Sequence, residues 1–393
     1  MNFAMPPDET QVSTLLKQKA FEYGFDCVGI VSPSAIPQAP HRLKTWLQAG
    51  YAADMVWMHE RAEQRADPHL LWPDVRSIIV LGVNYAPDYD PMESLQAYDH
   101  ATIAAYAQRK DYHDVIKGQL KQLAGWFAHH TREAVKVFVD TAPVMEKTLA
   151  QAAGIGWQGK HSVLVSRDFG NWLFLGAIYT TANLMPDHAE IDHCGSCQKC
   201  LTICPTQAFP EPYVLDSKRC IAYLTIEHKG VIDRALRPLM GNRIFGCDDC
   251  LAICPWNKFA QTARQNRLSL NSALHKLPLS ALIVLDDAAF RTLFAGTPVK
   301  RTGRERFMRN VLIAAGNSGN RDLIIHVITL LADPSALVRG ACVWALGQLM
   351  DGDAFHALYL SRCEHEHDLE VTYEWQAALT PQKQLTVVPS NPL

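Results

Sequence analysis

The stretch "CGSCQKCLTICP" at residues 194–205 decides the fold, and "CDDCLAICP" at residues 247–255 repeats part of it. In the first stretch three cysteines recur at two-residue intervals, and a fourth follows after three residues and precedes a proline. This is the spacing of the bacterial ferredoxin motif, in which the fourth cysteine binds the other cluster of a pair. The spacing therefore predicts a ferredoxin-like domain built around two 4Fe-4S clusters.

The same spacing predicts which cysteines share a cluster. A tight loop offers three thiolates to a cubane from one side, so the fourth ligand comes from elsewhere in the chain. We expect the first cluster to be bound by Cys194, Cys197, Cys200 and Cys254. We expect the second to be bound by Cys204, Cys220, Cys247 and Cys250. Cys220 stands alone and is included partly because it completes a set of eight.

Zinc is the alternative, because two distant C-x2-C pairs can also form a tetrahedral site. A zinc site does not require the third closely spaced cysteine or the two Cys-Pro endings.

The composition bears on the compartment in which these thiols would act. The first 26 residues contain acids and no long apolar run, and no later segment approaches the ~20 apolar residues of a membrane span. We expect a cytoplasmic protein with no membrane partner, in which clustered cysteines are ligands rather than disulfides.

At 393 residues and 48% hydrophobic, the chain is long enough for two or three domains. Helical patterns alternate with short β-rich runs at first, which predicts an α/β domain. The last third is helical, and "MRNVLIAAGN" at 308–317 resembles "RGACVWALGQ" at 339–348, which predicts HEAT-like helical repeats. The predicted divisions are an α/β domain at 1–185, the cluster domain at 186–265, the repeat domain at 266–380 and a flexible tail at 381–393. Nothing in the sequence suggests an obligate dimer, so we expect a monomer.

A basic run opens the helical part. It consists of Lys300, Arg301, Arg304, Arg306 and Arg309, against the single acid Glu305. With a net charge of −3, the chain is not broadly basic, so a nucleic acid would need a local footprint of this kind. We expect the run to neutralise about four phosphates of an RNA. The alternative is a solvated helix face, because charge runs at helix starts are common.

Beyond the cysteines, several segments are distinctive in order as well as in content. They are "RKDYHDVIK" at 109–117, "VDTAPVMEK" at 139–147, "GIGWQGKHS" at 154–162, "RCIAYLTIEHKG" at 219–230 and "MGNRIFGCDDC" at 240–250. With these segments the chain resembles the epoxyqueuosine reductase family over nearly its whole length. The chain has no G-x-G-x-x-G fingerprint after a strand and no Walker A motif, so neither a Rossmann-type cofactor site nor a nucleotide loop is predicted.

The resemblance implies a fold and a reaction. The α/β domain would be of the nitroreductase and reductive-dehalogenase type and would bind base-off cobalamin next to the first cluster. The enzyme would reduce epoxyqueuosine at the wobble position of a tRNA anticodon stem-loop to queuosine, by two electrons and with loss of water. The clusters would supply the electrons, which come from a donor that the sequence does not identify. Single-stranded anticodon loops are where proteins can reach splayed RNA bases.

The resemblance also implies roles for individual residues. Asp140 would be the catalytic proton donor and would lie at the cobalamin. The apolar run "VKVFV" at 135–139 ends at this aspartate, where α/β domains tend to place ligands. Donation at neutral pH requires burial to raise the carboxyl pKa above its ordinary value of ~3.9. The alternative is that Asp140 is the N-cap of a helix beginning near Pro143.

The remaining expected cobalamin contacts are Arg65, His161, Leu164, Leu175 and Ala222. Each has an ordinary explanation too: a solvated arginine, a buried hydrogen-bonded histidine, and core packing for the three apolar residues. Asp111, Tyr112 and His113 match pocket residues of the family, although a helix start would also explain them.

Two other functions fit parts of the sequence. The first is a cobalamin-free electron-transfer protein with two clusters and a protein-interaction tail. The second is a reductive-dehalogenase-like enzyme acting on a small substrate. The basic run and the helical tail argue against the dehalogenase-like enzyme, whereas corrin binding would distinguish the RNA-modifying enzyme from the electron-transfer protein.

Overall fold

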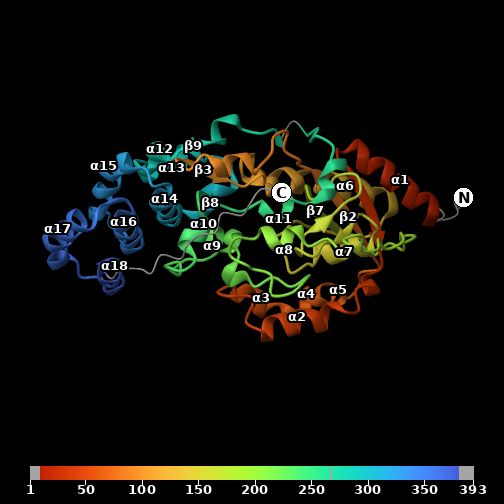
Figure 1. The fold of residues 1–393 in the computed structure, drawn as a ribbon. Coiled ribbons are helices and arrows are strands. Elements are labelled where there is room, and N and C mark those ends of the chain that lie inside the picture. Colours follow the sequence, from red (N-terminus) through yellow and green to blue (C-terminus); the bar gives the residue numbers. More distant parts are fainter. Residues whose placement is uncertain (1–8, 266–267, 380–393) are drawn as a thin grey trace, which may run out of the picture.

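The computed structural model describes residues 9–265 and 268–379. The molecule is elongated, with α1 (Glu9–Glu22) at one end and α16 (Ala336–Leu349), α17 (Gly352–Arg362) and α18 (Leu369–Leu379) at the other (Figure 1). The cysteine-containing segment lies between these ends. Across the described residues, no helix is both long and apolar enough to cross a bilayer.

A four-stranded sheet forms the centre of the N-terminal part. Its order is β1 (Cys27–Val31), β2 (Ser77–Asn84), β7 (Leu173–Thr180) and β4 (Val135–Phe138). Every neighbouring pair is antiparallel. The prediction of strands alternating with helices is confirmed. The rule that α/β domains place ligands at strand ends, used for Asp140, was framed for parallel sheets and does not apply to this antiparallel one. Apolar periodicity identifies strands but carries no information on their direction.

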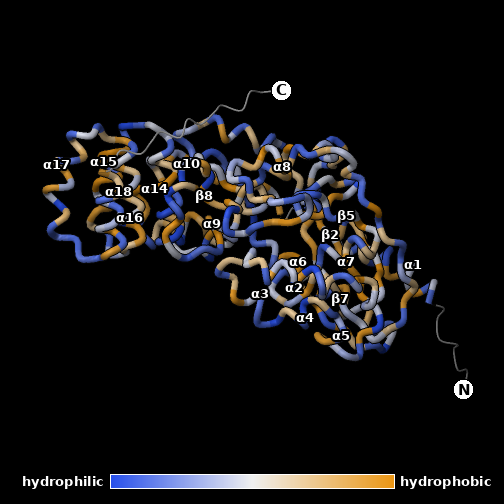
Figure 2. Tube along the Cα trace, turned by 60° about the horizontal axis from the view of Figure 1, so that its bottom comes forward, coloured by the Kyte–Doolittle hydropathy of each residue, from blue (hydrophilic) through white to orange (hydrophobic). Residues whose placement is uncertain are grey.

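Helices cover both faces of this sheet because successive residues of a strand point to opposite sides. From β2, Ile79 and Leu81 pack toward α1 and α6 (Tyr112–Thr131), whereas Ile78 and Val80 pack toward α7 (Glu146–Ala152). All eight residues of β2 are buried. The trace around β2 accordingly includes hydrophobic, orange segments (Figure 2).

Short elements surround the sheet. They are α2 (Ala39–Gln48), α3 (Val56–Glu60), α4 (Ala62–Ala66), α5 (Pro68–Leu71), β5 (Trp157–Gln158) and β6 (Leu164–Val165). The cysteine segment adds α8 (Lys199–Ile203), α9 (Ile221–Ile226), α10 (Arg237–Met240) and α11 (Asp249–Ala252).

A second small sheet joins parts of the chain that are distant in sequence. Its order is β8 (Arg243–Phe245), β3 (His100–Ile103) and β9 (Leu277–Pro278). Ala101 and Ile103 of β3 belong to the same apolar core as α9 and the C-terminal helices. The segment around β3 therefore packs with the cluster and helical parts. The predicted domain boundaries stay a prediction.

The C-terminal part is helical, as the sequence predicts. It contains α12 (Leu279–Ile283), α13 (Asp287–Leu293), α14 (Arg304–Ser318) and α15 (Ile324–Val327), followed by α16, α17 and α18. Helix α16 packs between α14 and α18. The two similar segments at 308–317 and 339–348 lie on α14 and α16, although their assignment as HEAT-like repeats stays a prediction. The predicted tail at 381–393 lies outside the described residues.

Candidate functional site

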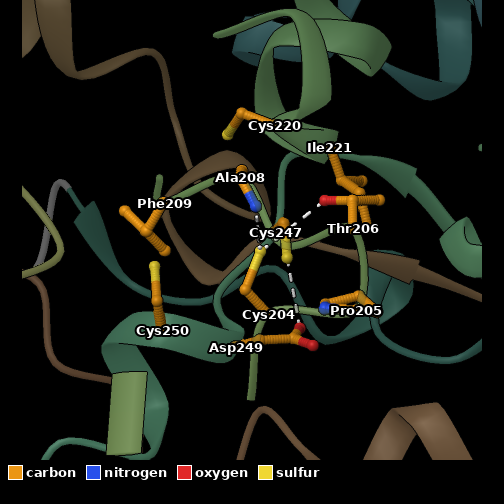
Figure 3. Close-up of a pocket in the computed structure, with 10 residues that line it drawn as sticks. All are labelled: Cys204, Pro205, Thr206, Ala208, Phe209, Cys220, Ile221, Cys247, Asp249 and Cys250. Atoms are coloured by element: carbon orange, nitrogen blue, oxygen red, sulfur yellow. Dashed lines mark hydrogen bonds between the residues drawn. The ribbon is translucent and has the colours of Figure 1, made fainter. Parts of the chain in front are cut away.

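Four cysteines from distant points of the chain line one pocket. They are Cys204, Cys220, Cys247 and Cys250, and the close-up shows them around a common space (Figure 3). Cys204 follows α8, Cys220 precedes α9, and Cys250 lies in α11. The isolated Cys220 is thus placed with the three that the motif predicted, by the docking of α9 against the two cysteine loops.

The surroundings of this pocket combine buried charge with apolar walls. The Sγ atom of Cys247 lies 3.2 Å from Oδ1 of Asp249, and Arg243 pairs with that carboxylate through Nε–Oδ1 at 2.9 Å and Nη2–Oδ2 at 2.5 Å. The backbone N–H of Ala208 donates to Sγ of Cys204 at 3.3 Å. Burial raises the pKa of the Cys250 thiol well above its ordinary value, and the neighbouring Cys220 thiol adds to the effect. Binding of these residues as thiolates therefore needs the positive charge of a metal centre.

The other four cysteines also lie together. Burial, together with the adjacent thiols of Cys194, Cys254 and Cys197, raises the pKa of Cys200 to about 11. Cys254, which lies more than fifty residues away in the sequence, therefore joins the three cysteines of the tight loop. Across the described residues, no group of three or more Cys, His, Asp or Glu side chains is arranged to hold a single metal ion.

Two residues of the "GIGWQGKHS" segment hold this loop. The indole Nε1–H of Trp157 donates to Sγ of Cys194 at 3.4 Å. The buried ammonium of Lys160 donates to the carbonyl oxygens of Gly195 and Cys197, at 2.7 and 2.8 Å. The hydrogen bond to sulfur and the nearby cation both favour negative charge at this site.

Asp140 lies after β4 in a left-handed conformation with φ of 50°. Its side chain is 59% exposed, and its backbone N–H donates to Oε1 of Glu146 at 3.1 Å. Helix α7 begins at Glu146 with Met145 as the N-cap residue. The interpretation of Asp140 as a helix N-cap is therefore wrong, and its carboxyl group is available to a ligand.

Two residues at the start of α6 contact the Asp140 carboxylate. The phenol of Tyr112 donates to Oδ2, and Nε2 of His113 lies 3.3 Å from the same oxygen. Although the side chain is 59% exposed, protein atoms around the Asp140 carboxylate partly desolvate it and so act to raise its pKa, but the hydrogen bonds from His113 and Tyr112 outweigh this effect and the net pKa is lowered. The expected upward shift is wrong for the protein chain alone. Asp111 is both the N-cap of α6 and part of the pocket, so the two interpretations of this motif are compatible.

Glu146 is a residue that the sequence reasoning missed. Burial and the nearby negative charge of Asp140 together raise the pKa of its carboxyl to about 7. The sequence did contain a signal, because Glu146 lies within the distinctive segment "VDTAPVMEK". An acidic residue in the first turn of a helix is commonly explained by its favourable interaction with the helix dipole, so the position of Glu146 in the sequence does not by itself suggest a role in the site.

The expected cobalamin contacts differ in what surrounds them. Arg65 faces Glu146 and Asp140, and its buried Nε has no hydrogen-bond partner. His161 is buried, its pKa is lowered by burial to about 4, and its Nδ1 accepts from the N–H of Val163 at 3.1 Å. The three apolar positions lie on three different elements. Leu164 is buried, and Leu175 and Ala222 are half-buried.

Comparisons with known proteins bear on what this site belongs to. A family model described as "4Fe-4S double cluster binding domain" matches residues 193–257, and one described as "Epoxyqueuosine reductase QueG, DUF1730" matches residues 65–141. An epoxyqueuosine reductase of Xanthomonas campestris pv. campestris is 40% identical over 346 residues, which are 87% of this chain and 97% of that protein. The chain belongs to the epoxyqueuosine reductase family. The resemblance seen in the sequence is thereby confirmed.

Other members of the epoxyqueuosine reductase family are similarly close. The protein of Escherichia coli K12 is 36% identical over 348 residues, which are 88% of this chain and 92% of that protein. A crystal structure of an epoxyqueuosine reductase with an epoxyqueuosine-modified tRNA-Tyr stem loop matches with a TM-score of 0.87 and 26% identity, covering 95% of this chain and 99% of that chain. A structure of the Bacillus subtilis enzyme matches with a TM-score of 0.85 and 26% identity, over the same shares of each chain.

The basic run at residues 300–309 is less exposed than the sequence predicts. Arg309 is buried and donates to the carbonyl oxygens of Leu224, His228 and Gly230. The other two arginines of α14 are also engaged: Arg304 pairs with Asp333 at 2.7 Å, and Arg306 donates to backbone carbonyls. Only Lys300 and Arg301 of the run are exposed. The expected footprint of about four phosphates is therefore wrong, because Arg304 is paired within the helical part and Arg306 and Arg309 donate to carbonyl oxygens of the cluster part.

Proposed function

We propose that this protein is an epoxyqueuosine reductase that reduces epoxyqueuosine at the wobble position of a tRNA to queuosine. The observation that carries the proposal is the Asp140 pocket, with its carboxylate, phenol and imidazole, in the same chain as two groups of four thiols. The reaction needs both electrons and protons, and these are the groups that can deliver them. A structure of a relative contains an epoxyqueuosine-modified tRNA stem loop, which supports the same substrate class here.

The eight cysteines fit two 4Fe-4S clusters. All of them lie inside the region that matches the double-cluster model. Cys194, Cys197, Cys200 and Cys254 would bind the first cluster, and the pocket of Figure 3 would hold the second through Cys204, Cys220, Cys247 and Cys250. The clusters would pass electrons one at a time from a donor protein or reductant to the reaction site.

The residues near Asp140 fit a corrin. The unpartnered Nε of Arg65 is a buried donor in need of an acceptor, and the amides or phosphate of cobalamin carry such groups. Leu164, Leu175 and Ala222 would line its apolar faces, and His161, neutral at its lowered pKa, would remain a buried hydrogen-bonding group. When bound, cobalamin supplies a cobalt centre that the clusters can reduce and that can act on the epoxide.

The chain itself would provide orientation and protons. Tyr112 and His113 hold the Asp140 carboxyl at the pocket, and Asp140 would pass a proton to the epoxide oxygen as its carbon–oxygen bonds break. The Bacillus subtilis structure is described as having the loop of a catalytic aspartate swung out of the active site. The left-handed backbone at Asp140 marks the corresponding kind of loop here, and we assign it the same role.

The decisive experiment is direct. The purified chain is reconstituted anaerobically with iron, sulfide and cobalamin, and incubated with a reductant and an anticodon stem-loop containing epoxyqueuosine. We expect about eight irons per chain from two clusters, corrin absorption bands, and queuosine in the nucleoside digest measured by mass spectrometry. Binding of zinc in place of iron, or the absence of queuosine with both cofactors loaded, would refute the proposal.

We further propose that the enzyme acts as a monomer in the cytoplasm, where its tRNA substrate is found. Sedimentation of the loaded enzyme alone and with the stem-loop tests the first part. A shift of mass to two chains per RNA would contradict it.

A further inference from the structure

A chain of polar contacts runs from Asp140 to the surface of the helical part. Nε2 of His113 lies 3.3 Å from Oδ2 of Asp140, and Nδ1 of His113 lies 2.7 Å from Oδ1 of Asp111. The second oxygen of Asp111 lies 2.5 Å from Nη2 of Arg301. The side chain of Asp111 is only 9% exposed, whereas that of Arg301 is 51% exposed. The contacts therefore link Asp140, through His113 and Asp111, to an exposed arginine in the segment before α14.

The stoichiometry of the reaction, which rests on the proposed function, requires a supply of protons that this chain of contacts can provide. Two carbon–oxygen bonds of the epoxide break, a carbon–carbon double bond forms, and the oxygen leaves as water. The balance requires two electrons, which the clusters supply, and two protons. A single carboxyl group carries one proton. Asp140 must therefore be protonated again during each turnover, or a second group must donate.

We propose that His113, held between Asp111 and Asp140, transfers protons to Asp140 during turnover, and that Arg301 holds Asp111 in place for this purpose. In the transfer, the N–H bond at Nε2 of the imidazolium breaks and an O–H bond forms at Oδ2 of Asp140. The imidazole keeps its proton at Nδ1 against Asp111 and regains one at Nε2 from solvent. His113 is a positioning and relay residue, because it acts on the substrate only through Asp140.

The charges around these groups place the resting proton on His113 and not on Asp140, whose pKa is lowered, so the transfer to Oδ2 is uphill and must accompany proton donation from Asp140 to the substrate. Burial lowers the pKa of His113, but its hydrogen bonds to Asp111 and Asp140 outweigh burial and the repulsion from Arg301, and raise it to about 9. His113 is thus an imidazolium at neutral pH. The other charged or titratable groups that face Asp140 are Tyr112, Lys147, Arg65, Glu146 and Tyr106.

Tyr112 is the other candidate for the second proton. It stacks on Phe174, with ring centroids 4.3 Å apart, and donates to Asp140. Burial raises the pKa of its phenol far above the ordinary value, and the negative charge of Asp140 raises it further. A phenol in this position keeps its proton. Tyr112 therefore orients the Asp140 carboxylate and does not return a proton to it.

The test compares single-turnover rates of queuosine formation between pH 6 and pH 10 in cofactor-loaded enzyme. The wild-type rate should hold at neutral pH and fall as the pH rises through about 9, because the protonated His113 is the active form. His113→Gln should lose about 100-fold or more at pH 8, and its rate should rise as the pH falls and proton donors in solution take over. Imidazole added to the buffer should restore part of the loss.

Asp111→Asn and Arg301→Gln test the rest of the chain without removing the imidazole. Asp111→Asn removes the charge that stabilises the imidazolium, so the fall in rate should move to lower pH. Arg301→Gln should lower the rate by loosening Asp111, and Arg301→Lys should restore most of it. Independently of activity, exchange of the imidazole Cε1 hydrogen, followed by mass spectrometry, reports the pKa of His113. That pKa should drop in Asp111→Asn.

A surface pair offers the matched control. His100 and Asp99 form an equally short contact, with Nδ1–Oδ1 at 2.7 Å, away from the pocket. His100→Gln and Asp99→Asn should leave the rate and its pH profile unchanged. The relay is refuted if His113→Gln keeps the wild-type rate and profile. If His113→Gln fails to bind its cofactors, an unshifted profile in Asp111→Asn together with a wild-type rate in Arg301→Gln refutes it instead. Absence of queuosine with the wild-type enzyme would refute the proposed function rather than the relay.

Discussion

At the scale of single residues, Asp140 combines an unusual backbone with an exposed carboxylate. Its φ of 50° places it in the left-handed region, which aspartate and asparagine tolerate better than other residues with a Cβ. Its partners Tyr112 and His113 lie 28 and 27 positions earlier in the chain. Desolvation alone would raise the pKa of the Asp140 carboxyl, and the hydrogen bonds from these two partners reverse the direction of the shift. The sequence pointed to the residue but could not give the sign.

The first prediction concerns the charge of Asp140. Asp140→Asn preserves the shape and the left-handed preference but cannot be a proton donor of the same strength. We expect turnover to fall by about 10²- to 10⁴-fold, with iron content and corrin binding unchanged. Queuosine formation and the visible spectrum measure the two effects. Wild-type turnover in this variant would remove Asp140 from the mechanism.

The second prediction concerns Glu146. A carboxyl whose pKa in the folded state is raised to about 7 binds its proton more tightly in the folded than in the unfolded chain. Its contribution to stability is therefore present at low pH and is lost as the pH rises toward 7. Glu146→Gln keeps an oxygen to accept from the Asp140 N–H and should raise Tm at pH 8 more than at pH 5. An equal change in Tm at both pH values would contradict this account.

At the scale of elements, buried ionic groups attach the C-terminal helices to the cluster part. Arg309 of α14 donates to the carbonyls that follow α9, and Glu374 of α18 accepts from Arg237 of α10 at 2.5 and 3.0 Å and from Arg234 just before it. Asn310 adds two hydrogen bonds to the carbonyls of Thr225 and Ile244. These contacts explain why a run that looks like a nucleic-acid footprint is mostly structural.

The third prediction tests one of these contacts. Glu374→Gln leaves two largely buried guanidinium groups without a charged partner, so we expect the free energy of unfolding to fall by about 3–5 kcal/mol. Urea unfolding followed by circular dichroism measures it. Asp287→Asn is the matched control, because it breaks the exposed Arg291–Asp287 pair on α13 and should cost no more than about 0.5 kcal/mol. Equal effects of the two variants would contradict the assignment.

At the scale of the whole molecule, the RNA-binding surface must be smaller than the basic run suggests. Lys300 and Arg301 are exposed, and the five N–H groups of an arginine allow Arg301 to contact a phosphate while it keeps its ion pair with Asp111. Of the remaining members of the run, Arg306 and Arg309 donate to carbonyl oxygens of the cluster part, whereas Arg304 pairs with Asp333 within the helical part.

The fourth prediction is the salt dependence of binding. The plot of log binding constant against log salt for the epoxyqueuosine stem-loop should become shallower by about 1.4 when Lys300 and Arg301 are both changed to Gln, at roughly 0.7 per phosphate on a single strand. Arg306→Gln should leave the slope unchanged, because that guanidinium donates to Ile226 and Thr302 carbonyls. A loss of slope in Arg306→Gln as large as in the double variant would show that the run acts as one surface.

By itself, the sequence determined the features that depend on local spacing. The intervals between cysteines predicted two clusters, apolar periodicity predicted the main helices and strands, and the distinctive segments identified the family. Spacing is informative here because a short loop of fixed geometry must present its thiolates to one small body.

Tertiary structure alone decided the features that depend on distant neighbours. It set the antiparallel order of the sheet, placed Cys220 among the other thiols, turned Arg309 inward, and surrounded Asp140 with Tyr112, His113 and Glu146. Burial and pairing are properties of contacts between residues far apart in the chain. The direction of a pKa shift or the exposure of an arginine is therefore the outcome of packing, and local sequence cannot specify it.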